Sequence, residues 1–117
     1  MLPRPNRLPG YRTSQVLSSK TTLHSPFFGL KVSPSDQPLT RIGFIISSKI
    51  AKRAVDRNRL KRLLRKAIRP HLQNLKPKHD LLFLAKHPLK TKTLDQIKPH
   101  ILTALKKAKL LNEKPSS

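Results

Sequence analysis

The sequence predicts an α+β fold in which helices pack on one small β-sheet. Three patterns point to this class. Apolar and polar residues alternate over residues 28–32 and 40–47, as they do in half-buried strands. Apolar residues recur every three or four positions between 60 and 68, as on one side of an amphipathic helix. The apolar run inside 80–86 indicates a strand that is covered on both faces.

The N-terminal half is predicted to hold an arm, a short helix and two strands. Residues 1–10 contain three prolines and a glycine, which favours a flexible basic arm. A first helix is expected over 11–19, and a strand over 27–32. Residues 33–38 have the composition of a turn. Because that turn joins the first strand to the alternating run at 40–47, we expect the two strands to form an antiparallel hairpin.

The C-terminal half is predicted to hold two longer helices around the apolar strand. The first spans residues 54–69, and Pro70 should end or kink it. The second spans about 94–111, although Pro99 is awkward inside a helix and could mark its true start. Residues 112–117 are polar and are expected to fray. We therefore expect one domain over residues 11–111.

The charge of the chain points to a polyanionic partner. The 117 residues include 26 Lys and Arg against five acids, a net charge of +21. Binding to nucleic acid releases counterions from the phosphates, which favours that partner over an acidic protein. A membrane partner is disfavoured because there is no Trp and the longest apolar run is five residues. The first residues resemble neither a secretory signal nor, with three prolines, an amphipathic transit peptide, so we expect a cytoplasmic protein.

The strongest local signal is a basic stretch over residues 49–69, which has ten Lys or Arg and one acid, Asp56. On a helical wheel the basic residues lie opposite the apolar stripe, where guanidinium groups suit phosphates. A solvated helix face is the alternative, but such faces usually mix charges of both signs. The candidate RNA-binding residues are Lys49, Lys52, Arg53, Arg57, Asn58, Arg59, Lys61, Arg62, Arg65, Lys66 and Arg69.

The spacing of this stretch resembles that of the bacterial ribonuclease P protein component. In that family an apolar strand and a lysine-bearing loop precede Ala-x-x-Arg-Asn-Arg-x-Lys-Arg-x-x-Arg on a helix. The seven matching positions are Ala54, Arg57, Asn58, Arg59, Lys61, Arg62 and Arg65. Length, basicity and element order also agree, so the resemblance covers about residues 7–111.

The resemblance implies a fold and a function beyond what composition shows. The fold would be a small mixed sheet of four strands in α-β-β-β-α-β-α order, with a left-handed β-α-β crossover and a further short strand near Thr21–Leu23. The protein would be the accessory subunit of an endoribonuclease whose catalyst is RNA. It would bind that RNA, and the 5′ leader of precursor tRNA in a cleft between the first helix and the sheet. Mg²⁺ would sit on the RNA, and no membrane or small-molecule substrate is implied.

The sequence also departs from the family pattern. Ser48 replaces the first of two lysines before the helix, and Lys66 replaces an acid. Thr13, Leu17 and Leu30 stand where aromatic residues are common, which would weaken stacking on the leader. The leader-cleft candidates are therefore Tyr11, Leu17, Phe27, Phe28, Leu30 and Lys31. Core packing is the alternative role for the two Phe residues.

The residues argue against catalysis by the protein itself. The five acids are scattered, there is no Cys, and the five His lack the helical spacing of paired metal ligands, so we expect no catalytic residue and no metal site in the protein. Two other functions remain open. A ribosomal protein or general RNA chaperone would have a similar composition, whereas a DNA-binding domain would usually carry a recognisable motif that is absent here.

Overall fold

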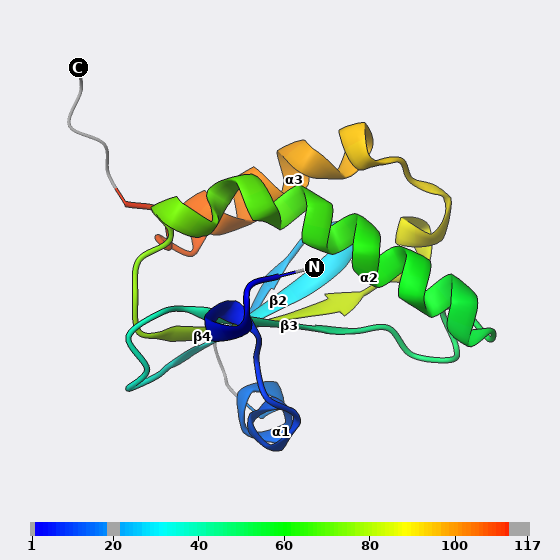
Figure 1. Ribbon diagram of the computed structural model, residues 1–117. Helices are drawn as coiled ribbons and strands as arrows, with labels where there is room; N and C mark the ends of the chain where they lie inside the picture. The colour runs from blue at the N-terminus through cyan, green and yellow to red at the C-terminus, as the bar shows by residue number, and fades with distance from the viewer. Residues whose placement is uncertain (1, 19–21, 113–117) are drawn as a thin grey trace.

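The computed structural model describes residues 2–18 and 22–112, and within them it confirms the α+β class. Two long helices cover one face of a four-stranded sheet, and a short helix lies on the other face (Figure 1). The elements are α1 (Gly10–Leu17), β1 (Thr22–His24), β2 (Phe28–Pro34), β3 (Arg41–Ile45), α2 (Ala54–Ile68), β4 (His79–Ala85) and α3 (Leu94–Lys107). The further strand that the resemblance implied is β1, although Thr21 lies outside the described residues.

The strand order is β1-β2-β4-β3, so the predicted hairpin between residues 27–32 and 40–47 is wrong. β4 lies between β2 and β3, antiparallel to the first and parallel to the second. The physical reason is the apolar run of β4, in which Leu81, Leu82 and Phe83 are fully buried. An apolar run of this kind favours a central strand, which has a hydrogen-bonded neighbour on each side and cover on both faces. The parallel pair β3 and β4 is joined through α2.

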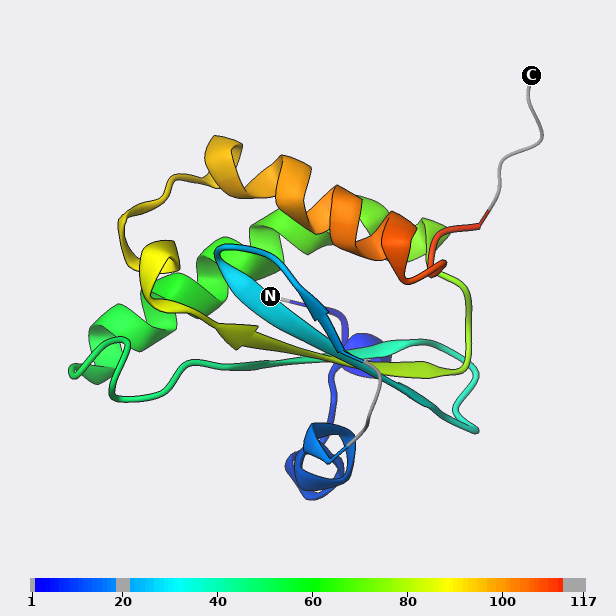
Figure 2. The ribbon, with the colours of Figure 1, turned by 180° about the vertical axis from the view of Figure 1, so that it is seen from behind.

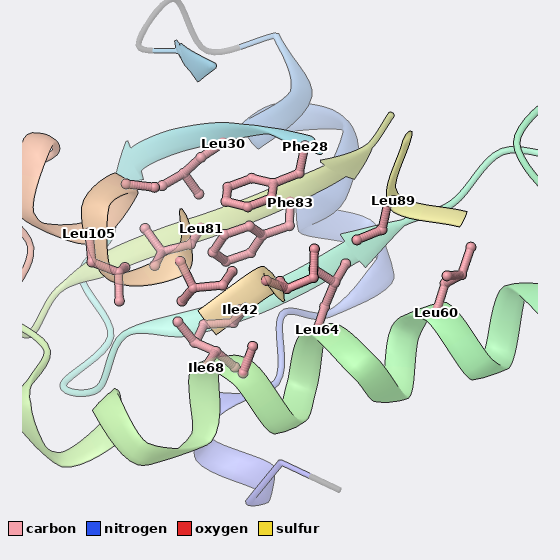
Figure 3. Packing of buried hydrophobic residues seen from close by; sticks show 14 of the residues in the cluster. Phe28, Leu30, Ile42, Leu60, Leu64, Ile68, Leu81, Phe83, Leu89 and Leu105 are labelled. Carbon is pink, nitrogen blue, oxygen red and sulfur yellow. The ribbon is translucent and has the colours of Figure 1, made fainter. Parts of the chain in front are cut away.

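The main core lies between the sheet and the two long helices. Figure 3 shows Phe28 and Leu30 of β2 and Phe83 of β4 facing the side chains of α2. Phe28 and Phe83 meet edge to face, with ring centroids 5.3 Å apart. This packing buries the helix-facing side of the sheet, which leaves its other side to α1.

The helices begin and end where their local chemistry allows. The α-helix of α2 ends at Ile68, one residue earlier than expected, and Pro70 lies in a 3-10 helix that follows it. α3 begins at Leu94, because Thr93 forms a capping box with Gln96. Pro99 therefore lies inside this helix, and the suggestion that it marks the start is wrong.

The N-terminal arm is docked on the sheet, which corrects the prediction of a flexible arm for the described residues 2–10. The Leu8 amide donates to the Ile42 carbonyl oxygen at 3.1 Å, and the Asn6 side-chain amide donates to Thr40 O at 2.9 Å. Leu2 is buried in the main core. The arm thus covers the free edge of β3 and satisfies part of its backbone.

Neighbouring leucines of α2 test the helix phase. Leu64 is fully buried, whereas Leu63 is only half-buried at the margin of the core. We expect Leu64→Ala to lower the free energy of unfolding by about 2–5 kcal/mol and Leu63→Ala to lower it clearly less. Urea unfolding of both variants measures this. Equal losses would contradict the packing described above.

Candidate nucleic-acid interface

One side of α2 carries many closely spaced basic side chains. Leu60, Leu64 and Ala67 are buried against the sheet, which confirms the predicted helix phase and turns the basic side outward. We use the term cationic face of α2 for five basic residues of the helix and for Arg69 directly after its end: Arg59, Lys61, Arg62, Arg65, Lys66 and Arg69. Four of these side chains are exposed and two, Lys61 and Arg65, are half-buried. Asn58 and the loop residues Lys49 and Lys52 are exposed beside them.

Acidic partners are almost lacking on this surface. Among the ion pairs within the described residues, Arg53 alone of the candidate RNA-binding residues has one, because its Nε lies 3.2 Å from Asp56 Oδ2. Both side chains are partly solvated, so the pair contributes little. The other cations lie close to one another without compensation, and repulsion between them disfavours the free protein. A polyanion on this surface would relieve that repulsion.

Arg57 has a role that the sequence did not reveal. Its Nη1 donates hydrogen bonds to the carbonyl oxygens of Ala51 at 2.9 Å and Lys52 at 2.7 Å. These bonds hold the loop that brings Lys49 and Lys52 to the start of α2. The structure therefore gives Arg57 a positioning role for the loop. The only sequence signal for this role was a basic residue near the start of a helix. That signal is ambiguous, because a long arginine side chain can extend into solvent or fold back onto the backbone.

On the opposite side of the sheet, α1 is fastened by a buried carboxylate. Asp80 of β4 is fully buried and accepts hydrogen bonds from two arginines, a group we call the Asp80 clamp. Arg12 Nε lies 2.8 Å from Oδ2, and Arg41 Nε and Nη2 lie 2.8 Å from Oδ1 and Oδ2. Because Arg12 belongs to α1, the clamp fixes α1 on β2 and β4. Sequence reasoning missed it, since no local pattern joins residues 12, 41 and 80.

The clamp keeps its carboxylate ionised. Burial raises the pKa of Asp80, but the hydrogen bonds and charges of Arg41 and Arg12 outweigh burial and hold that pKa below its ordinary value. The same hydrogen bond to Asp80 raises the pKa of Arg41, against the opposing effect of its burial. Asp80 and Arg41 therefore remain charged over the whole neutral range.

The cleft candidates separate into two groups. Tyr11 is 76% exposed and Leu17 is 42% exposed, both on α1. Lys31 is half-buried and alternates with the core residue Leu30, so it faces the α1 side of the sheet. A cavity of about 350 Å³ beside the clamp is lined by Tyr11, Arg12, Gln15 and Arg41, among others. Of the six cleft candidates, all of them within the described residues, Tyr11 is the one that lines this cavity.

Three cleft candidates lie away from α1, and burial contradicts the prediction for two of them, Phe28 and Leu30. Phe28 and Leu30 are fully buried on the helix-covered face, where no ligand reaches them. Phe27 contacts the ring of His100 in α3, with centroids 4.5 Å apart, and Lys92 Nζ lies 5.4 Å from its centroid. The strand alternation placed Phe28 and Leu30 on one face correctly, and that face is the core.

The described part of the chain contains no candidate metal site and no candidate membrane-spanning helix. No three His, Cys, Asp or Glu side chains come together there in a way that could hold a metal ion. No helix within residues 2–18 and 22–112 is long and apolar enough to cross a bilayer.

Comparisons with known proteins agree on one family. The model of the family described as Ribonuclease P matches residues 2–109. A ribonuclease P protein component from Synechococcus sp. (strain JA-2-3B'a(2-13)) is 37% identical over 121 positions, which cover 95% of this chain and 87% of the relative. One from Dehalococcoides mccartyi (strain CBDB1) is 35% identical, with 86% of this chain and 81% of the relative covered.

Solved structures show the same fold. The RNase P protein of Staphylococcus aureus superposes with a TM-score of 0.79 at 24% identity, over 92% of this chain and 98% of that one. The RNase P protein from Thermotoga maritima gives a TM-score of 0.76 at 20% identity, over 86% and 96%. The mixed four-stranded sheet with its helices is thus a known arrangement.

Asp80→Asn tests the clamp. Removing the charge leaves two arginines without their buried partner, so we expect the free energy of unfolding to fall by about 3–5 kcal/mol at neutral pH. Since the pKa of Asp80 is lowered in the folded state, its contribution is present above the ordinary pKa of about 4 and is lost as pH falls through the folded value. The difference between wild type and variant should therefore shrink in acid, as measured by urea unfolding from pH 7 downward.

Asp95→Asn is the matched control for that experiment. The side chain of Asp95 is 93% exposed and lies 3.9 Å from Lys98, so its removal should change stability little at any pH. A difference for Asp80→Asn that stays constant down to strong acid would contradict the ionised clamp.

Arg62 and Arg57 should respond differently to truncation. Arg62→Ala removes an exposed cation, so we expect weaker RNA binding and a salt slope reduced by about one. Arg57→Ala removes two hydrogen bonds to carbonyl groups and should mainly lower stability, by about 1–3 kcal/mol. Titrations of structured RNA at several salt concentrations, with parallel thermal melts, separate the two effects. If the salt dependence of RNA affinity is unchanged in Arg62→Ala, the Arg62 side chain is only solvated and does not contact a phosphate.

Proposed function

The chain belongs to the ribonuclease P protein family, and from that premise we propose that it binds the catalytic RNA of ribonuclease P and the 5′ leader of precursor tRNA. The observation that carries the proposal is the cationic face of α2, whose six basic side chains have no acidic partner within the described residues. Phosphates are the ligands that such a surface recognises best. The family motif occupies this same helix.

Two surfaces on opposite sides of the sheet fit two RNA segments. Figure 2 shows the helix α1 on the side of the sheet opposite to α2. The cationic face of α2 would hold the catalytic RNA, while α1 and the Asp80 clamp would border the cleft proposed for the leader. Tyr11 is exposed on α1 and could stack on a leader base, which is worth about 1–3 kcal/mol. The protein would thereby raise the affinity for precursor tRNA, and the RNA would perform the cleavage.

Within this proposal, magnesium belongs to the RNA. Phosphate oxygens hold Mg²⁺ well, and the protein would lower the requirement for it by supplying positive charge near the phosphates. The protein would act as an accessory subunit in removing the leader, with no catalytic side chain of its own. Its cytoplasmic location stays a prediction.

Leader removal at low magnesium tests this function. A bacterial ribonuclease P RNA should cleave precursor tRNA faster when the full chain is added, because the protein neutralises phosphates and holds the leader. The stimulation should be larger for a long leader than for a single-nucleotide leader, since only the long one reaches the cleft. Arg62→Ala should weaken it. Tight RNA binding without any stimulation would favour a ribosomal protein or general RNA chaperone instead.

A further inference from the structure

A cavity between α2, the edge strand β3 and the docked arm stands apart from the cleft beside α1. Its volume is about 300 Å³, enough for a flat heterocycle. Part of its lining is apolar and comes from Leu8, Ile42 and Phe44. Because Leu8 is held there by its hydrogen bond to the Ile42 carbonyl oxygen, the docking of the arm completes this wall.

Phe44 gives the cavity an aromatic wall. Its ring stacks on Phe83 with centroids 5.7 Å apart and an interplanar angle of 20°. Phe83 is fully buried, whereas Phe44 remains partly accessible and lines the cavity. A flat ring bound beside it could extend the aromatic packing. Such rings are the natural ligands of partly exposed aromatic side chains in proteins that bind single strands.

The remaining lining is cationic. Arg7 of the arm and Lys61 and Arg65 of α2 line the same cavity, and none of its lining residues is acidic. Lys61 and Arg65 belong to the cationic face of α2, so the cavity continues the surface proposed for phosphates. Apolar and aromatic walls next to three cations match a nucleotide, in which a flat base is attached to a charged backbone.

We propose that this cavity binds one unpaired nucleobase of an RNA, with the adjacent phosphates on Arg7, Lys61 and Arg65. The proposal rests on the proposed function, because it assumes that RNA lies along α2. It assigns the base to a site separate from the leader cleft. The base would come from the catalytic RNA or from precursor tRNA, and the two sources are distinguished by adding each RNA alone.

Phe44→Trp tests the site directly, because the chain has no other Trp. Stacking of a base on the indole should quench its fluorescence when a single-stranded oligoribonucleotide binds. An abasic ribose-phosphate chain of the same length should bind with little quenching. The RNA that supplies the base in the complex should quench as well, and the other should not. Binding of the oligoribonucleotide without quenching would overturn the proposal.

Phe44→Leu provides an independent measurement, with Phe27→Leu as its matched control. Both Phe residues are half-buried, but Phe27 packs on α3, away from the cavity. We expect Phe44→Leu to weaken binding of the single-stranded oligoribonucleotide about tenfold and to leave matched duplex RNA and the salt slope unchanged. Phe27→Leu should change none of these. Equal losses for single strand and duplex, or no loss in a variant that melts normally, would refute a base site.

The cleavage assay keeps this inference separate from the proposed function. If the wild-type protein stimulates leader removal and Phe44→Trp shows no quenching, the base site is wrong and the function stands. If the wild-type protein does not stimulate cleavage but quenching occurs, the chain binds unpaired RNA for another purpose.

Discussion

The buried carboxylate of Asp80 fixes the geometry on which the candidate cleft depends. α1 is only eight residues long, and Val16 is its single fully buried side chain. An isolated helix of that length would not be stable in water. The two arginines on Asp80 therefore supply what hydrophobic contact alone does not, a fixed position for α1 on the sheet. In a chain with five acids, one of them is placed where it organises two basic side chains.

The sheet also solves an electrostatic problem. A net charge of +21 on a small domain opposes folding, because like charges are brought together. Figure 1 shows α2 and α1 on opposite sides of the sheet. The fold therefore separates two basic regions, the cationic face of α2 and the pair Arg12 and Arg41 at Asp80 on the α1 side. Asp80 compensates one of the two charges in the second region. The first region has no acidic partner within residues 2–18 and 22–112, and this is where an RNA partner would contribute most.

Local sequence patterns predicted most of the elements, and the family resemblance added β1. The contacts between the elements were largely not predictable from these patterns. The spacing of Leu60 and Leu64 revealed the buried side of α2, because helical periodicity is a local property. Strand order depends on pairing between distant residues, so the hairpin was wrong even though both strands were identified. The alternation at Phe28 and Leu30 showed that they share a face, but not that this face is the core. Asp80 looked like an ordinary polar residue at the start of a strand.

Electrostatic attraction alone would not make such a protein selective. Counterion release favours any nucleic acid, and its contribution falls steeply as salt rises. Selectivity requires contacts that depend on shape, held in fixed positions. Arg57 fixes the loop before α2, Asp80 fixes α1, and the docked arm fixes one wall of the cavity at Phe44. In each case a polar contact within the protein fixes the position of a candidate binding surface. Preference for structured RNA over duplex DNA would then arise from these fixed surfaces, and the cations would supply the affinity.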